Sequence, residues 1–288
     1  MHDLNTNRKE ISMLHNLHSF SLVSLPMLAV ISVNCAYAQD IETISMPDPS
    51  HWPSLQQPDE SEWKFEAGVG VIYGTEYEGS DNYRFMPIPN VSVNYKEGLF
   101  FAGIFDGVGT YPIQSENYKV GMSIGWEFGR KEDDDSDNLR GMGDIDTAMV
   151  ANLMGEYSLG PIQISGKISR GNSDYGTTAT LDVGTMFPVS EHLMVMTSIS
   201  TTWADADHMQ TYFGVSSAQS VRSGYRRYDA KSGFKSVGVS VGAIYDISEK
   251  WDVMFMFNGD KLLGDAEDSP ITKEDIQPTI FLTTSYKF

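Results

Sequence analysis

The nine residues that end the chain, "IFLTTSYKF" (Ile280–Phe288), alternate between apolar and polar side chains. The apolar members of one parity are Ile280, Leu282, Tyr286 and Phe288. The other parity is polar except at Phe281 and contains Thr283, Ser285 and Lys287. Because successive side chains of a β-strand point to opposite faces, this pattern predicts a strand that continues to the last residue. Such a strand requires a neighbour to pair with, and its apolar face requires an apolar environment.

The same alternation recurs upstream of the terminal strand. Segments that show it include "WKFEAGVGVIY" (63–73), "YKVGMSIGWEFG" (118–129) and "KWDVMFMFNG" (250–259). Their apolar faces run for about nine to eleven residues, the length that a tilted strand needs to cross a bilayer. Aromatic residues gather at the segment ends, as they do at membrane–water interfaces. We therefore predict an all-β fold, an antiparallel transmembrane β-barrel over residues 63–288.

A secreted β-sandwich is the alternative, because it would show the same alternation. It does not account for the aromatic segment ends or for the terminal Phe288. The face opposite the apolar one is made of Gly, Ser, Thr and scattered charges, which suits a small filled lumen better than a dry core. The mean hydropathy of −0.26 is compatible with a barrel, since lipid-facing and lumen-facing residues average to a polar value.

The connections between the segments provide an independent check on the barrel. Short ones alternate with long ones from the C-terminus back to Tyr118, as expected for short periplasmic turns and long external loops. Upstream, the alternation closes if "LFFAGIFDGVGTYPI" (99–113) forms two short strands that turn at Asp106-Gly107, a favoured hairpin dipeptide. That arrangement gives about twelve strands. If the stretch is one kinked strand, the count falls to ten.

The N-terminal region has the organisation of an export signal. Arg8 and Lys9 precede the apolar run "FSLVSLPMLAVISV" (20–33), and "AYA" (36–38) supplies a small-x-small cleavage site. We predict a signal peptide over residues 1–38, with either Met1 or Met13 as the start. The acidic, proline-containing residues 39–62 are predicted to form a flexible periplasmic segment. The only cysteine lies within the predicted signal peptide, so the mature chain contains none.

The charge balance excludes one class of partner. The chain carries 20 basic and 39 acidic residues, and removal of residues 1–38 leaves 18 and 37, so the net charge stays at −19. So acidic a protein is not expected to bind nucleic acid, which requires basic surfaces. The sequence also contains no nucleotide-binding or zinc-finger spacing. We predict no cofactor.

Several motifs in a fixed order resemble one family. They are "GSDNYRFMPIPNVSVNY" (79–95), "DGVG" (106–109), "GRKEDDDSDNLRGMGDID" (129–146), "YFGVSSAQSVRSGYRRYDAKSG" (212–233) and "LLGDAEDSP" (262–270). Together they resemble the MipA/OmpV family of outer-membrane proteins over roughly residues 63–288. The resemblance implies an outer-membrane barrel. It also implies a non-enzymatic scaffold that joins a murein hydrolase to a murein synthase, although other members are described as adhesins or as porin-like.

The acidic run 132–137 lies in a predicted external loop. Asp133, Asp135 and Asp137 are candidate ligands for Ca²⁺ or Mg²⁺, since hard cations prefer carboxylate oxygens. The run lacks the glycine and the distal glutamate of an EF-hand loop. A solvated charged loop is therefore the stronger interpretation.

Arg222, Arg226 and Arg227 form the most basic patch of this acidic chain. They could contact lipopolysaccharide phosphates, or they could fold their long loop onto the rim or into the lumen; we favour the structural role. His208 is the one plausible general base of the mature chain, but no G-x-S-x-G nucleophile motif accompanies it. We therefore expect no enzymatic activity.

Three functional hypotheses remain open. The first is a scaffold for peptidoglycan enzymes, bound through the periplasmic turns or the segment 39–62. The second is a narrow channel lined by Glu66, Glu127 and Lys167, and the third is an adhesin that uses the external loops. In each case the outer-membrane lipid and lipopolysaccharide surround the barrel. Tyr286 and the terminal Phe288 resemble the signal that the barrel assembly machinery reads.

Overall fold

The computed structural model describes residues 62–172 and 175–288. The predicted signal peptide, its two candidate start sites and almost all of the predicted segment 39–62 lie outside the described residues.

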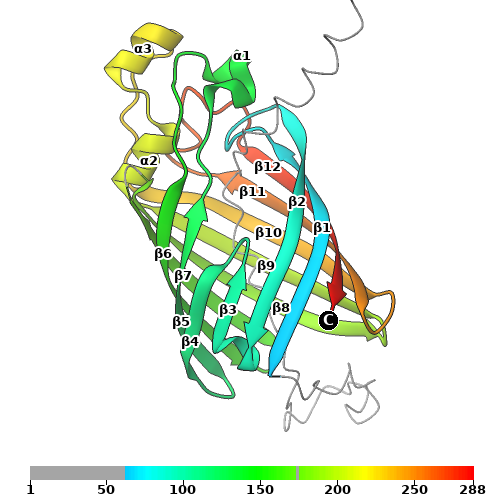
Figure 1. Cartoon of the computed structure of the whole chain (residues 1–288). Helices are drawn as coiled ribbons and strands as arrows, with labels where there is room; N and C mark the ends of the chain where they lie inside the picture. The colour runs from blue at the N-terminus through cyan, green and yellow to red at the C-terminus, as the bar shows by residue number, and fades with distance from the viewer. Residues whose placement is uncertain (1–61, 173–174) are drawn as a thin grey trace, which may run out of the picture.

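Twelve antiparallel strands form a closed barrel, in which each strand pairs with its sequence neighbours and the last pairs with the first (Figure 1). The strands are β1 (Trp63–Thr75), β2 (Tyr83–Tyr95), β3 (Phe100–Gly103), β4 (Gly107–Gln114), β5 (Tyr118–Glu127), β6 (Ala148–Leu159), β7 (Ile162–Gly171), β8 (Thr177–Ser190), β9 (Leu193–Ala204), β10 (Gly233–Asp246), β11 (Trp251–Leu262) and β12 (Ile276–Lys287). β3 and β4 divide residues 99–113 as predicted, so twelve strands are confirmed over ten.

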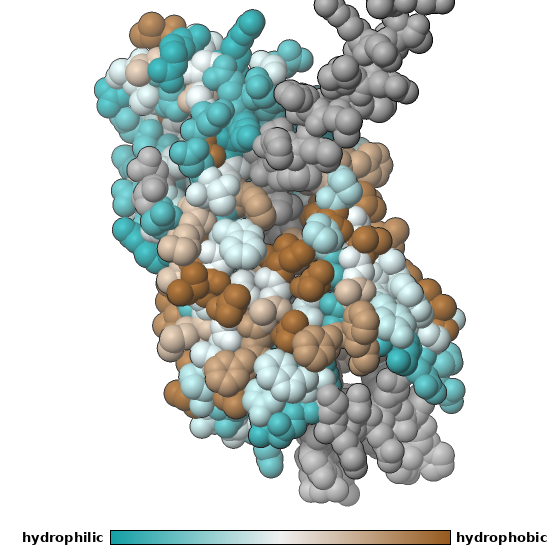
Figure 2. Space-filling view, in the orientation of Figure 1, coloured by the Kyte–Doolittle hydropathy of each residue, from teal (hydrophilic) through white to brown (hydrophobic). Residues whose placement is uncertain are grey.

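The terminal strand closes the barrel against the first strand, as the alternation predicts. β12 pairs with β1 from Glu66↔Lys287 to Tyr73↔Ile280. Ile280 and Leu282 are 38% and 43% exposed on the outside, whereas Phe281 is 2% exposed on the inside. Phe281, which interrupts the polar parity in the sequence, is therefore part of the interior. Figure 2 shows hydrophobic residues across the middle of the wall, between more hydrophilic ends.

The two ends of the barrel differ. One end, here called the turn end, carries the start of β1, the C-terminus and the short connections 96–99, 115–117, 160–161, 191–192 and 247–250. The other, here called the loop end, carries the longer connections 76–82, 128–147, 172–176, 205–232 and 263–275. Its helices are α1 (Ser136–Leu139), α2 (Ala206–Phe213) and α3 (Ser217–Ser223) (Figure 1). Within the described ranges, no helix has the length and apolar character to span a bilayer.

An apolar cluster occupies the interior at mid-height. Its buried members are Ile72, Met86, Ile88, Met256 and Phe281, with Phe105, Met196 and Met254 packed against them. Phe105 comes from the β3–β4 connection, and its ring meets Phe281 edge-on with 5.8 Å between centroids. The short hairpin therefore contributes to filling the lumen as well as to the wall.

The wall has its fewest interstrand hydrogen bonds beside the β3–β4 hairpin. Among the described residues, β2 pairs with β3 only over Ser92–Tyr95, so its remaining length has β1 as its single neighbour. Pro87 and Pro89 lie in that stretch. Proline has no N–H to donate and is tolerated in sheets at edges, so these two positions suit an edge without a partner strand. We call this part of the wall the β2 edge.

Truncation of Phe281 tests whether the apolar cluster stabilises the barrel. We expect Phe281→Ala to lower the free energy of unfolding by about 3–5 kcal/mol, because it removes a buried ring and leaves a cavity. Denaturant unfolding of the detergent-solubilised barrel, followed by heat-modifiable mobility, measures the change. Leu282→Ala, on the adjacent lipid-facing position, is the matched control and should cost much less. Equal losses in the two variants would contradict the packing role.

Candidate functional site

The long connections interlock into a cap over the loop end. The Tyr77 hydroxyl donates to the carbonyl of Ile271 at 2.7 Å, and the Ser269 hydroxyl donates to the carbonyl of Phe213 at 2.6 Å. Tyr225 donates to the carbonyl of Asn138 at 2.9 Å. Each bond joins two different connections, so the loops hold one another in place.

The acidic run 132–137 is part of this cap, and its carboxylates at Asp134 and Asp135 bond to other protein side chains. Asp135 is 3% exposed and accepts hydrogen bonds from the side chains of Ser80, Asn82 and Asn138 at 2.8–3.2 Å. Burial alone would raise the pKa of Asp135, but these hydrogen bonds outweigh it and hold the pKa below its ordinary value. Its neighbour Asp134 pairs with Arg84 at 3.0 Å.

The three candidate cation ligands do not converge. Asp133 and Asp137 are exposed, whereas Asp135 is buried in the cap. In the described part of the chain, no group of three or more His, Cys, Asp or Glu side chains is arranged to hold a metal ion. The geometry instead gives Asp134 and Asp135 a structural role between the connections 76–82 and 128–147.

The three candidate arginines separate into two roles. Arg222 donates to the carbonyl of Gly141 at 3.1 Å, and Arg226 donates to the carbonyl of Asp268 at 3.2 Å. Both therefore join the connection 205–232 to other parts of the cap. Arg227 forms an exposed bidentate ion pair with Asp229, at 3.0 Å for the closer oxygen.

His208 lies in α2 and is buried beneath the cap, with 1% exposure. Its Nδ1 lies 2.9 Å from the carbonyl of Tyr175, and its ring stacks on Tyr212 with 4.5 Å between centroids. Burial, and to a smaller extent the nearby Lys235, lower the pKa of His208 to about 3. A neutral, enclosed imidazole of this kind packs and orients α2, which gives no support to a role as a general base.

Two layers of the lumen contain charged side chains. Near the turn end, Lys287 pairs with Asp252 and Asp246, each at 3.1 Å, and Glu66 lies beside them. Toward the loop end, the almost buried Lys235 pairs with Glu78 at 2.8 Å. The apolar cluster lies between these layers. The residues predicted to line a channel are therefore divided: Glu66 lies toward the turn end, whereas Glu127 and Lys167 interact electrostatically with each other. Lys167 also interacts with Asp106, which follows Phe105 in the β3–β4 connection.

The turn Lys96–Gly98 is the most strained part of the turn end. Lys96 and Glu97 have φ values of 44° and 58°, and within the described ranges no other non-glycine residue has a positive φ. A side chain in this conformation costs about 1–2 kcal/mol relative to the ordinary region. Lys96 is tied down by an ion pair with Glu62 at 2.9 Å. The Glu97 side chain is exposed and makes no ion pair with a described residue.

Comparison with known proteins identifies the family. Residues 67–288 match the family described as MltA-interacting protein MipA. The chain belongs to the MipA family. It is 23% identical over 233 residues to the MltA-interacting protein of Escherichia coli K12, an alignment that covers 79% of this chain and 92% of that relative. The corresponding protein of Shigella flexneri has the same identity and coverage.

Solved barrels are similar to this MipA-family chain at low identity. OmpT of Vibrio cholerae aligns with 78% of this chain and 96% of its own, at 9% identity and a TM-score of 0.35. The KdgM porin aligns with 77% of this chain and 99% of its own, at 7% identity and a TM-score of 0.39. The family match and the closed twelve-stranded wall together assign this chain to the outer-membrane type of transmembrane barrel.

Two features of this MipA-family barrel were not predicted from the sequence. The buried Glu78–Lys235 pair joins residues 157 positions apart, and no local spacing connects them. The strained turn lies in "YKEGL" (95–99), whose Gly98 predicts one residue with positive φ but not three. Both depend on strand register, which fixes which residues meet.

Acidification tests the role of His208. Because its folded pKa lies below the unfolded value, an undocked α2 binds a proton that the docked helix does not, and docking weakens as the pH falls from about 6.5 toward 3. At pH 5 the loss is about 2 kcal/mol. Hydrogen exchange of the α2 amides at pH 7 and pH 5, corrected for intrinsic rates, measures it. His208→Gln should remove the dependence, and an unchanged profile in that variant would refute the assignment. The pKa values of Asp135 and Asp205 are also lowered in the folded chain, so these two carboxylates add to the pH dependence of stability only below about pH 4.

Proposed function

We propose that this chain is a non-catalytic outer-membrane scaffold that binds a peptidoglycan-remodelling enzyme at its turn end. The observation that carries the proposal is the interlocked cap at the loop end together with the apolar cluster in the lumen, because both favour function at the surface of the barrel over passage through it. Relatives in the same family carry the name MltA-interacting protein, and the partner proposed here is accordingly a murein hydrolase of the MltA kind, with a murein synthase as a second partner.

The proposed orientation follows from the connections. Bacterial barrels keep short turns in the periplasm and long loops outside, which supports an orientation with the turn end and both termini in the periplasm, where peptidoglycan lies. On this orientation the cap faces the exterior. The acidic surface makes nucleic acid an unsuitable partner.

The strained turn is the proposed contact. Glycine would adopt the conformation of Glu97 without penalty, so the side chain is retained there at a cost in stability. Strain of this kind is concentrated at functional sites. An exposed carboxylate on a rigid turn can accept hydrogen bonds from arginine or lysine of a partner.

Affinity capture from detergent-solubilised envelopes tests the scaffold. We expect the tagged wild-type chain to retain a lytic transglycosylase of the MltA kind, and Glu97→Gly to retain roughly tenfold less, as loss of one charge-assisted contact implies. Because Glu97→Gly relieves strain, it should fold at least as well as the wild type. Glu191→Gly, in the exposed β8–β9 turn, is the matched control.

Failure of the wild-type chain to retain any murein hydrolase or synthase would overturn the scaffold. Retention that Glu97→Gly and Glu191→Gly reduce equally would overturn the assigned turn. Planar-bilayer recordings address the channel alternative: the apolar cluster predicts a silent barrel, and steady conductance by the wild type would favour transport.

Deletion of Phe288 tests whether the barrel assembly machinery recognises this terminal residue. Phe288 is 70% exposed, and its ring meets Tyr286 edge-on with 4.9 Å between centroids. A residue so exposed adds little packing to the finished barrel, so we expect its deletion to reduce the amount assembled in the outer membrane while leaving the unfolding midpoint of assembled protein nearly unchanged. Heat-modifiable mobility of membrane fractions gives the amount. Normal amounts of assembled barrel would refute the role.

A further inference from the structure

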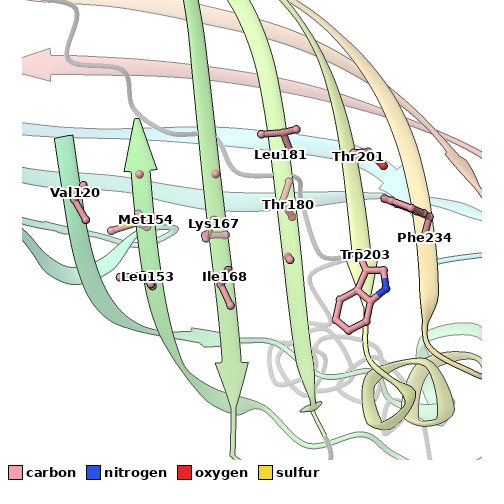
Figure 3. A pocket seen from close by; sticks show the side chains of 13 residues that line it. Val120, Leu153, Met154, Lys167, Ile168, Thr180, Leu181, Thr201, Trp203 and Phe234 are labelled. Carbon is pink, nitrogen blue, oxygen red and sulfur yellow. The ribbon is translucent and has the colours of Figure 1, made fainter. Parts of the chain in front are cut away.

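The outer wall contains a groove that crosses six strands, β5 to β10. Its volume is about 510 Å³, within the usual range of ligand pockets. Figure 3 shows Val120 and Leu153 toward one end of it and Trp203 and Phe234 toward the other. The walls are apolar and include Ile168 and Leu181.

The groove exists because small residues meet in register on the lipid-facing side. Gly155 pairs with Gly166 across β6 and β7, and a Cβ atom added at Gly155 would have no neighbour within 4 Å. Ala179 and Thr201 continue the floor on β8 and β9. Around this floor, Leu153, Ile168 and Leu181 are each about half exposed: 53%, 49% and 50%. The hollow is therefore part of the surface that faces lipid.

Polar groups stand at the loop end of the groove. Arg170 lies two residues beyond Ile168 on β7, and therefore on the same face. Its side chain is 61% exposed, and its hydrogen bonds to Thr177 at 2.6 Å and to Asp205 at 3.1 Å both leave from Nη1. Within the described ranges, the Nε and Nη2 atoms of this guanidinium have no hydrogen-bond partner. Trp203, with an indole N–H, lies at the same end (Figure 3).

We propose that this groove binds one acyl chain of lipid A, with a lipid A phosphate held at Arg170. An occupant of an apolar groove in the bilayer must itself be soluble in hydrocarbon, and an acyl chain is narrow enough to lie between two rows of side chains. The cation and the indole at one end match a chain that ends in a phosphorylated head group. Lipid A, rather than a phospholipid, is the phosphorylated lipid of the outer leaflet, so this choice rests on the proposed orientation with the loop end outside.

Selectivity for this lipid cannot come from the hydrophobic effect, because lipid tails are as apolar as the groove. It comes from close packing along the floor and from the charge-assisted contact at Arg170. The two contributions can be removed separately. Gly155→Leu fills the floor in open space and leaves the backbone undisturbed, while Arg170→Gln removes the charge.

Native mass spectrometry of the detergent-solubilised full chain tests the proposal. Purified lipid A and phosphatidylglycerol are added in separate arms at equal concentration. We expect lipid A to be retained more strongly than phosphatidylglycerol, and Gly155→Leu and Arg170→Gln each to retain roughly tenfold less lipid A. Val69→Leu, an exposed lipid-facing position on β1, a strand that does not line the groove, is the matched control and should bind as the wild type does.

Heat-modifiable mobility verifies that every variant is folded, and if Gly155→Leu is unfolded it is replaced by Gly166→Leu, which fills the same floor from β7. Equal lipid A retention by the wild type and the filled variants would overturn the site. Phosphatidylglycerol retained as well as lipid A would overturn the choice of lipid. A dimer of the wild type that Gly155→Leu dissociates would show that a second copy occupies the groove, and would also overturn the proposal.

Discussion

The structure depends on one constraint: backbone N–H and C=O groups inside a bilayer have no water to bond with, so every strand must find partners on both sides. A sheet meets this condition by closing on itself. Here closure is made by β12 and β1, whose ladder runs from Glu66↔Lys287 to Tyr73↔Ile280. Closure in turn fixes an inside and an outside for each strand, and the alternation of side chains follows from it.

The inside is organised in layers along the barrel. Ion pairs toward each end flank an apolar cluster in which Phe105 and Phe281 meet. Burying charges is unfavourable unless they are paired, and each of these layers contains an ion pair, Lys235–Glu78 in one and Lys287–Asp252 in the other. Above them the connections bond to one another through buried side chains such as Tyr77 and Asp135. A barrel so filled differs from an open pore in what it can offer a partner: rigid ends and a shaped outer wall.

Much of this architecture could be predicted from the sequence, because alternation and turn chemistry are local. The alternation of Ile280–Phe288 predicts the closing strand, and the Asp106-Gly107 dipeptide predicts the hairpin that brings the count to twelve. What could not be predicted depends on register between distant strands. The pairing of Gly155 with Gly166 makes a groove only because both glycines face outward at the same height. Likewise, the run 132–137 suggests exposed carboxylates, whereas Asp135 is buried because Ser80 and Asn82 arrive from another loop.

The β2 edge has a mechanical consequence. A closed wall carries circumferential tension, and its strength at each point is that of the ladder there. β1 and β2 share pairings from Trp63↔Tyr95 to Thr75↔Tyr83, whereas β2 and β3 share those of Ser92–Tyr95 and β3 and β4 only those of Phe101–Gly103. Most of the wall is therefore held by long ladders, and only the β2–β3 and β3–β4 ladders are short. Lateral pressure from the bilayer, or a load applied at either end of the barrel, deforms its outline at these short ladders while the opposite wall keeps its curvature.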